Sequence, residues 1–287
     1  MTESHRQATA LRQWSGKTDG TTWMQRSLVT MFRFMPLLPV YGIMALVVPF
    51  YMLFRREGYL AIYHYFRQRW SYSPLRAFFG VYHNHFLFGQ VVLDRFAAFA
   101  GKQYHCEIEH LERFNQLADS NQGFLMLSSH VGCFEIGGCM LTSQKTVNAV
   151  VFAGETSTVR TGRENLLTNH NMRLIPVRDD MSHLFAINAA LDRNEIVSMP
   201  ADRVNGSSKA VRCSFLGAEA SFPRGAFALA KAKGVPILAV FVMKEGMKRY
   251  RFFLERVDDA TQFASALESV LHRYPAQWFN FYEFWKQ

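Results

Sequence analysis

The chain has few cysteines, and their spacing does not form a metal site. Its 287 residues include four, Cys106, Cys133, Cys139 and Cys213, with no CxxC pair. Structural zinc sites place close pairs of Cys or His ligands in the sequence. A site built from His130 and Cys133 would lack a second pair. We therefore predict no metal and interpret the cysteines as small buried thiols in a reducing compartment.

Several other patterns are also missing. The sequence has neither a GxGxxG nor a GxxxxGK[ST] loop, so we expect no nucleotide cofactor and assign no cofactor of another kind. Its lysines and arginines are not packed into runs, which makes nucleic acid the least favoured partner. Residues 1–23 are polar and do not read as a secretory signal.

The composition is that of a folded protein with a positive charge suited to an acidic partner. Hydrophobic residues make up 49% of the chain and aromatic residues 15%, which excludes disorder. The length suffices for a full α/β core. A net charge of +9 suits an acidic membrane surface or an acidic carrier protein.

An uncharged segment of 21 residues, 34–54, is long enough to cross a bilayer. It contains Pro36, Pro39 and Pro49, which disfavour a straight helix but are tolerated in membrane helices. Three alternatives stay open: one span, an interfacial or re-entrant hairpin, or a buried core helix. Two arginines lie in the ten residues before the segment and four follow it before residue 70, which favours a cytoplasmic catalytic region.

From residue 101 short apolar runs alternate with amphipathic stretches. We predict strands over 124–128, 148–152, 172–176, 196–199, 210–215, 237–243 and 250–257, and helices over 134–143, 156–170, 182–193, 223–233 and 261–274. This alternation predicts an α/β fold with a mostly parallel central sheet and flanking helices, preceded by an N-terminal membrane-associated helical segment. We divide the chain into residues 1–100, the membrane-associated helical region, and 101–287, the catalytic region packed against it.

His130 directly follows the predicted strand 124–128, and Glu135 stands five residues later. In such sheets ligands bind at the carboxyl ends of the strands. An imidazole titrates near neutrality and can act as a general base. A carboxylate one turn away can bond the far ring nitrogen and fix its tautomer. The same residues also fit a capped helix start with a hydrogen-bonded histidine, and local residues do not separate the two interpretations.

The segment 123–138 resembles the first motif of the lysophospholipid acyltransferase superfamily. Its form, with Glu135 and with Gly132 two residues after His130, is most similar to the bacterial lipid A biosynthesis (late) acyltransferases. Further segments resemble later motifs of that family in the same order, so that the resemblance covers about residues 105–257: Met199–Arg203, Val211–Gly217, Phe222–Ala226 and Gly234–Ile237.

The third motif departs from the glycerolipid branch of the superfamily. That branch carries Phe-Pro-Glu-Gly-Thr, whereas here Arg224 replaces the Glu and Ala226 replaces the Thr. In the branch the acid and the glycine help to hold an acceptor phosphate. The departure therefore argues against a simple glycerol-phosphate acceptor and leaves the acceptor open.

The resemblance implies an acyltransferase-like sandwich in which His130 activates an acceptor and Glu135 orients the ring. Backbone N–H groups around Gly132, or at the helix start near Glu135, are expected to stabilise the oxyanion.

Three further residues are assigned to substrate binding, Asp202 and Arg203 by the resemblance and Arg224 by its place at the start of a predicted helix. Asp202 and Arg203 are expected to shape the acceptor or donor site, with a structural salt bridge as the alternative. Arg224 is expected to meet a phosphate, with a solvated surface arginine as the alternative.

The function implied is membrane-associated acyl transfer from an acyl carrier protein or acyl-CoA thioester to a hydroxyl or amine of a lipid or glycolipid. The place implied is the bacterial inner membrane, with anionic lipid as a partner and no nucleic acid. A thioesterase or lipid hydrolase using the same histidine, or a non-catalytic membrane assembly protein on this fold, is the alternative.

Overall fold

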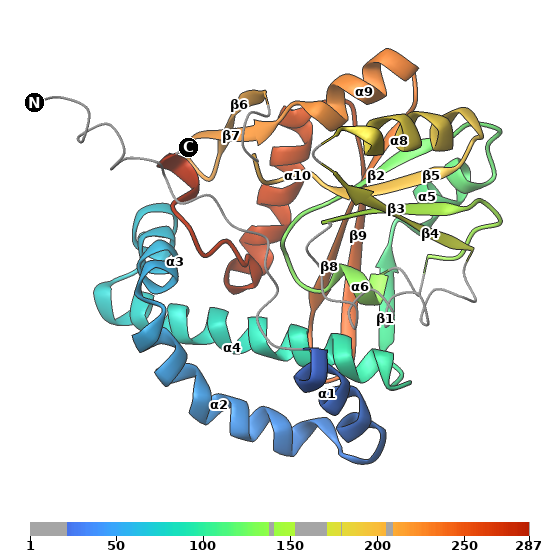
Figure 1. The fold of residues 1–287 in the computed structure, drawn as a ribbon. Coiled ribbons are helices and arrows are strands. Elements are labelled where there is room, and N and C mark those ends of the chain that lie inside the picture. Colours follow the sequence, from blue (N-terminus) through green and yellow to red (C-terminus); the bar gives the residue numbers. More distant parts are fainter. Residues whose placement is uncertain (1–21, 138–140, 153–170, 179, 205–208, 287) are drawn as a thin grey trace, which may run out of the picture.

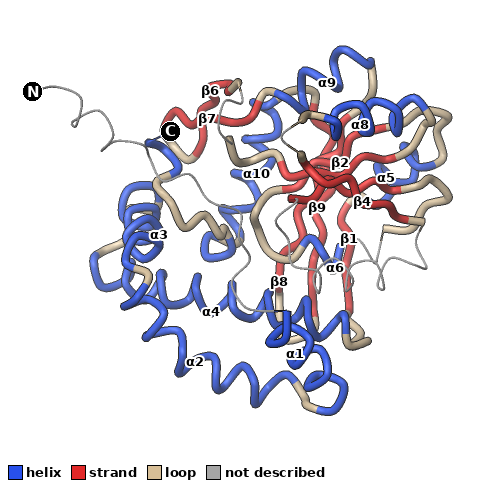
Figure 2. The backbone as a smooth tube through the Cα atoms, in the orientation of Figure 1, coloured by secondary structure: helices blue, strands red, loops and turns tan. Residues whose placement is uncertain are grey.

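The computed structural model describes residues 22–137, 141–152, 171–178, 180–204 and 209–286. Four helices come first and lie below and to the left of the strands in Figures 1 and 2. These are α1 (Thr22–Phe34), α2 (Leu37–Phe54), α3 (Arg56–Arg69) and α4 (Pro74–Phe99). Ser73 caps α4, because its side chain accepts a hydrogen bond from the backbone N–H of Arg76, and Pro74 occupies the first helical turn.

The remaining described residues alternate between strands and helices. The strands are β1 (His105–Glu109), β2 (Phe124–Ser128), β3 (Val147–Phe152), β4 (Met172–Val177), β5 (Ile196–Pro200), β6 (Ala210–Phe215), β7 (Ala218–Pro223), β8 (Ile237–Lys244) and β9 (Arg249–Val257). The helices are α5 (Leu111–Ala118), α6 (Phe134–Gly137), α8 (Ser182–Asp192), α9 (Gly225–Lys233), α10 (Ala260–Arg273) and the 3-10 turns η1 (Pro275–Gln277) and η2 (Phe284–Lys286).

Within the described residues, the central sheet has seven strands in the order β1-β9-β8-β2-β5-β3-β4. Strands β8, β2, β5, β3 and β4 are parallel to one another, while β9 runs antiparallel to β8 and pairs in parallel with β1. Strands β6 and β7 form a separate antiparallel hairpin. The predicted α/β fold with a mostly parallel sheet is therefore confirmed.

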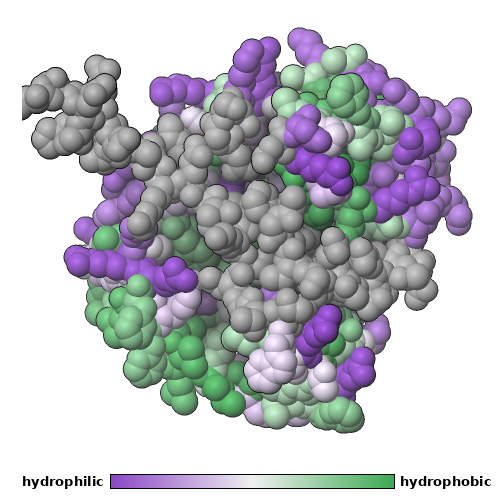
Figure 3. Space-filling model, viewed as in Figure 1, coloured by the Kyte–Doolittle hydropathy of each residue, from purple (hydrophilic) through white to green (hydrophobic). Residues whose placement is uncertain are grey.

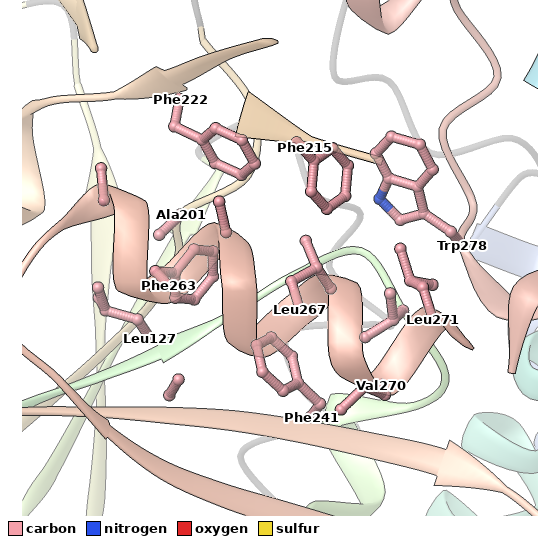
Figure 4. Close-up of a cluster of buried hydrophobic side chains, with 14 of the residues drawn as sticks. Leu127, Ala201, Phe215, Phe222, Phe241, Phe263, Leu267, Val270, Leu271 and Trp278 are labelled. Carbon is pink, nitrogen blue, oxygen red and sulfur yellow. The ribbon is translucent and has the colours of Figure 1, made fainter. Parts of the chain in front are cut away.

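The sheet is covered on both faces, as the buried central strand β8 shows. All eight residues of β8 are buried. Its alternate side chains enter two different hydrophobic clusters, one shared with α8, α9 and α10, the other with α5 and α6. In the first cluster Phe263 of α10 packs against Phe222 and Phe241 (Figure 4). The sheet thus presents its edges, and not its faces, to ligands.

The elements predicted from residue 101 on agree with the structure except at the end of one helix and at three elements that were not predicted, β1, α5 and β7; one further predicted helix is not described. The helix predicted over 134–143 ends at Gly137, with residues 141–143 not helical, and the helix predicted over 156–170 lies outside the described residues. Strands β1 and β7 were not predicted. Both are short, and the residues of β1 are only partly buried, so the apolar pattern that indicates a buried strand is weak there.

The apolar segment 34–54 forms essentially one helix, α2 (Leu37–Phe54), which Pro36 separates from the end of α1 at Phe34. Pro49 lies inside α2 and cannot donate to the carbonyl of Ala45. The hydroxyl of Tyr82 on α4 donates to that carbonyl at 3.0 Å. The proline is therefore accommodated because α4 supplies the missing hydrogen bond.

Helix α2 packs along α4 on one side and is exposed on the other. Most of its residues are exposed, so the interpretation as a buried core helix is wrong. Helix α2 is long and apolar enough to cross a membrane. Figure 3 shows apolar surface over this part of the molecule. The large apolar side chains of α2 that are more than half exposed are Leu38, Ile43, Leu46, Val47, Phe50, Leu53 and Phe54.

A buried carboxylate, Asp94 on α4, ties α2 to the sheet. The Lys244 ammonium at the end of β8 lies 2.5 Å from it. Tyr104 donates to it at 3.1 Å, and Tyr41 of α2 and Tyr250 of β9 donate as well. A buried ion pair is tolerated when further hydrogen bonds satisfy it, as here. We call these residues the Asp94 cluster.

Replacing Tyr41 by phenylalanine is expected to lower the free energy of unfolding by about 1.5–3 kcal/mol, because it removes a hydrogen bond to a buried charge. The measurement is denaturant unfolding of the detergent-purified protein. Tyr82→Phe is the matched control at the same helix pair, and its loss of a neutral hydrogen bond should lower the free energy by only about 0.5–1.5 kcal/mol. Equal losses would mean that α2 is not held by the Asp94 cluster.

Candidate active site

His130 and Asp202 meet because their strands are neighbours in register. Strand β2 pairs with β5 so that Ser128 lies opposite Pro200. Each functional residue stands two positions beyond that pair. The Ala201 N–H donates to the carbonyl of Ser128 at 2.9 Å and continues the pairing. The two side chains therefore emerge at the carboxyl edge of the sheet, where parallel α/β proteins bind ligands.

Asp202 holds the histidine through both carboxylate oxygens. Its Oδ1 lies 2.7 Å from Nδ1 of His130. Its Oδ2 accepts hydrogen bonds from the backbone N–H of His130 at 2.9 Å and from the hydroxyl of Ser129 at 2.7 Å. The carboxylate is completely buried. The ring and the main chain of His130 are thus fixed by one side chain.

The surroundings of Asp202 keep it ionised. Burial by itself raises the pKa of this carboxyl, but the charge and hydrogen bonds of His130 and the charge of Arg203 outweigh burial and hold the pKa well below its usual range. An ionised carboxylate accepts only, so Nδ1 carries the proton. The lone pair of the neutral ring is then on Nε2. With 26% of its side chain exposed, His130 is placed to act as a general base.

Glu135, which we expected to orient the histidine ring, lies in α6, and its carboxylate is 3.2 Å from the guanidinium of Arg95 on α4. Both side chains are largely buried. The carboxylate on Nδ1 of His130 is that of Asp202, which corrects the expectation that Glu135 takes this position. The spacing in the sequence favoured Glu135, because the sequence does not show that β2 pairs with β5.

Gly132 makes the turn between His130 and α6. Its φ of +49° lies in the left-handed region, and a Cβ there would come within 1.8 Å of the carbonyl oxygen of Val242. Its N–H donates to the carbonyl of Gln277 at 3.1 Å, and the Cys133 N–H donates to that of Val242 at 2.9 Å. These two N–H groups are engaged, which corrects the expectation that Gly132 stabilises an oxyanion, while the N–H groups at the helix start near Glu135 stay a prediction. Gly132 allows the turn between His130 and α6, residues 130–133, to lie against β8. Because it carries the candidate base, we call it the catalytic turn.

The variant Gly132→Ala is expected to have a lower free energy of unfolding than the wild type. The decrease should exceed the roughly 1–2 kcal/mol that a left-handed backbone alone costs an alanine, because the turn must also move away from β8. Such a displacement of His130 should lower activity about 10²-fold. Unfolding and product formation are measured together. Gly217→Ala, at a φ of +75° with no atom near the added Cβ, is the control that carries strain without a clash. Matching behaviour of the two variants would contradict the packing role.

A segment near the C-terminus closes over the turn, which sequence reasoning missed. The Phe279 N–H donates to the carbonyl of His130 at 2.9 Å, and Val131 forms a β-bridge with Trp278. Arg203 donates from Nε to Asn280 Oδ1 and from its terminal nitrogen to the Phe279 carbonyl, both at 2.9 Å. Arg203 thus fastens this segment to the Asp202 loop, a structural role close to the alternative that we left open.

Arg224 is exposed at the N-terminal end of α9. Among the described residues its guanidinium forms no hydrogen bond or ion pair, so the structure does not bring it into contact with His130 or Asp202. The described part of the chain also holds no group of three or more His, Cys, Asp or Glu side chains placed to bind a metal. Phosphate contact by Arg224 stays a prediction.

The comparison with known families agrees with this geometry. A family model described as bacterial lipid A biosynthesis acyltransferase matches residues 98–287, more than half of the chain. The match confirms the resemblance found in the motifs and includes His130, Glu135, Asp202, Arg203 and Arg224. A search of the curated proteins found no match.

Proposed function

The chain belongs to the bacterial lipid A biosynthesis acyltransferase family, and on that premise we propose that it transfers a fatty acyl chain from a carrier thioester to a hydroxyl or amine of a membrane lipid or glycolipid. The proposal is carried by one observation. His130 lies at the carboxyl edge of the sheet with Nδ1 held 2.7 Å from the buried carboxylate of Asp202. This arrangement supplies a general base of defined tautomer.

The transfer proceeds without a covalent enzyme intermediate. Nε2 of His130 takes the proton of an acceptor hydroxyl while the oxygen of that hydroxyl forms a bond to the thioester carbonyl carbon. The tetrahedral intermediate expels the carrier thiolate, and the protonated ring returns the proton to that sulfur. An ester and a free thiol result. Asp202 stabilises the imidazolium that forms between the two proton transfers.

Two side chains near His130, Ser129 and Cys133, carry groups that could act as nucleophiles, but neither is available for attack. The hydroxyl of Ser129 donates to Asp202 Oδ2 at 2.7 Å. The thiol of Cys133 is completely buried, and burial, followed by the charge of Glu135, raises its pKa well above the usual value, so it stays protonated. Both features favour direct attack by the acceptor over an acyl-enzyme.

The site and the apolar face of α2 support a membrane-bound acceptor. The exposed side chains of α2 form a surface suited to lipid, and Arg33, Arg55 and Arg56 stand at the ends of α1 and α2. The net charge of +9 favours a highly acidic donor such as acyl carrier protein over coenzyme A, since complementary fields speed encounter. We place the protein at the bacterial inner membrane with the catalytic region facing the cytoplasm.

The experiment is product analysis by mass. Detergent-purified protein is incubated with long-chain acyl carrier protein, or with the matching acyl-CoA, and a total bacterial lipid extract, with heat-denatured protein as the blank. The expected product is a lipid heavier by one acyl group, whose mass identifies the acceptor.

Each other outcome leads to a different assignment. Free fatty acid without acylated lipid in the presence of every lipid class would favour a thioesterase or lipid hydrolase. Absence of any turnover by folded protein would favour a non-catalytic assembly role on this fold.

A further inference from the structure

A groove of about 1000 Å³ lies between α2 and α4. Its walls are α2 and α4, and its floor is the β8–β9 turn, residues 244–249, with residues 273–277. We call it the α2–α4 groove. None of His130, Glu135 or Asp202 lines it. The opposite face of α4 carries Phe88, whose ring packs on Phe279 of the segment that closes the catalytic turn. The groove is therefore separate from the proposed acyl-transfer site.

The groove has two chemically different parts. Leu38 and Ala45 of α2 and Phe86 and Leu87 of α4 supply an apolar wall. Leu38, 63% exposed, belongs also to the exposed apolar face of α2. A Cβ added to Gly42 would meet no atom within 4 Å, so the space beside α2 is open at this point. The apolar part of the groove therefore opens beside the surface that faces lipid.

The floor is polar and carries excess positive charge. Three cationic side chains, Lys244, Arg249 and Arg273, line it, against one carboxylate, Glu245. Glu245 is already held by Arg251 at 2.7 Å and by the hydroxyl of Tyr274 at 2.6 Å. The floor is thus complementary to an anion.

The three cations differ in how far they are engaged. Lys244 is buried against Asp94 at 2.5 Å, and Arg273 lies 3.3 Å from Glu109. The guanidinium of Arg249 is exposed and forms no hydrogen bond or salt bridge with another described residue, although its charge contributes to the lowered pKa of Glu245. The Arg249 guanidinium is free to bind a phosphate in bidentate fashion.

We propose that the α2–α4 groove binds one anionic phospholipid of the bilayer, with its phosphate at Arg249 and an acyl chain along Leu38, Ala45, Phe86 and Leu87. The proposal rests on the membrane location included in the proposed function. A phosphodiester joined to an acyl chain matches the two parts of the groove, and lateral entry from the bilayer suits its opening beside α2. The bound lipid fills the gap between α2 and the floor.

The groove also touches the support of the catalytic turn through one residue. Gln277 lines the floor and holds the main chain of Lys244 through both ends of its amide, at 2.8 and 2.7 Å. Its carbonyl accepts the hydrogen bond of Gly132 at 3.1 Å. Gln277 therefore connects the floor of the groove to the turn that follows His130.

The test is native mass spectrometry of the full-length protein after exchange into nanodiscs containing equal amounts of phosphatidylglycerol and phosphatidylcholine. One retained phosphatidylglycerol per chain is expected. Arg249→Gln should lower that occupancy about tenfold, because a charge-assisted contact is lost. Gly42→Phe should lower it by filling the groove. Arg256→Gln, an equal charge change at an exposed site outside the groove, and Leu46→Phe, on the outer face of the same helix, are the matched controls and should retain the lipid.

Several outcomes would overturn the proposal. These are equal retention of the two lipids, equal loss in the groove and control variants, and displacement of the lipid by inorganic phosphate alone, which would assign the floor to free phosphate. The same measurement on His130→Ala protein, which should retain the lipid, keeps a failure of the proposed acyl transfer distinct from an empty groove.

Discussion

Replacing His130 by alanine is expected to lower acyl transfer by about 10²–10⁴-fold, the usual contribution of a general base. The acceptor hydroxyl then has no group to take its proton while it attacks the thioester. The ring is partly exposed and stands at the edge of the sheet, so its removal leaves the two hydrophobic clusters complete. The rate is measured as the initial formation of acylated lipid at saturating donor.

His105→Ala is the matched control for this variant. His105 lies on β1, with 70% of its side chain exposed, and its nearest carboxylate is 4.0 Å away. Its removal should leave the rate unchanged. Folding of both variants is checked by thermal unfolding. Wild-type turnover by folded His130→Ala protein would rule out the general-base role.

Replacing Asp202 by asparagine is expected to lower the rate by roughly 10²–10⁴-fold through a different cause. The amide oxygen can still accept from Ser129 and from the His130 N–H, but its NH₂ group then faces Nδ1. That contact favours the tautomer whose lone pair is on Nδ1, and the base is lost from Nε2. The expected signature is a large fall in kcat with little change in KM, because the carboxylate of Asp202 is completely buried against His130 and Ser129 and acts through the position of the base.

Glu135→Gln is the comparison that separates the two carboxylates. The glutamine keeps the size of the side chain and loses the ion pair with Arg95, 3.2 Å away. If Asp202 orients the ring, this variant should lose much less activity than Asp202→Asn. The reverse order would restore the assignment based on the spacing of His130 and Glu135.

The difference in stability between the wild type and Asp202→Asn should also depend on pH. The pKa of Asp202 is depressed in the folded state. A depressed carboxyl pKa stabilises the fold above the unfolded value of about 3.9 and loses that contribution as pH falls through the folded value. The part of the stability difference between wild type and Asp202→Asn that comes from this charge should therefore be full near neutrality and should shrink as pH falls below about 4. A gap independent of pH would mean that the charge of Asp202 does not stabilise the fold.

Local sequence pattern determined most of the sheet. Apolar runs of four to seven residues between polar turns predicted β2, β3, β5 and β8 closely, because strands buried on both faces have near-continuous hydrophobic sequences. Strands β1 and β7 lack that burial pattern and were missed. The order of the strands depends on which apolar faces pack together in space, so the local sequence pattern does not predict that order.

The site divides in the same way. His130 could be singled out from its position after a buried strand and from the motif around it, both of which are properties of one continuous segment. Its carboxylate partner could not, because Asp202 is 72 residues away along the chain and becomes a neighbour only when β5 pairs with β2 in parallel register. The Arg95–Glu135 pair and the closing segment at Trp278–Asn280 were hidden for the same reason.

The sequence by itself determined the α/β class, the family and the apolar character of residues 34–54, and it singled out His130 as the candidate base, since each rests on composition, period or a contiguous motif. The tertiary structure alone decided which carboxylate holds the base, that the Gly132 N–H is occupied, and that α2 is tied to the sheet by the Asp94 cluster. These depend on contacts between distant segments, whose free energy comes from burial and hydrogen bonding that exist only after the chain has folded.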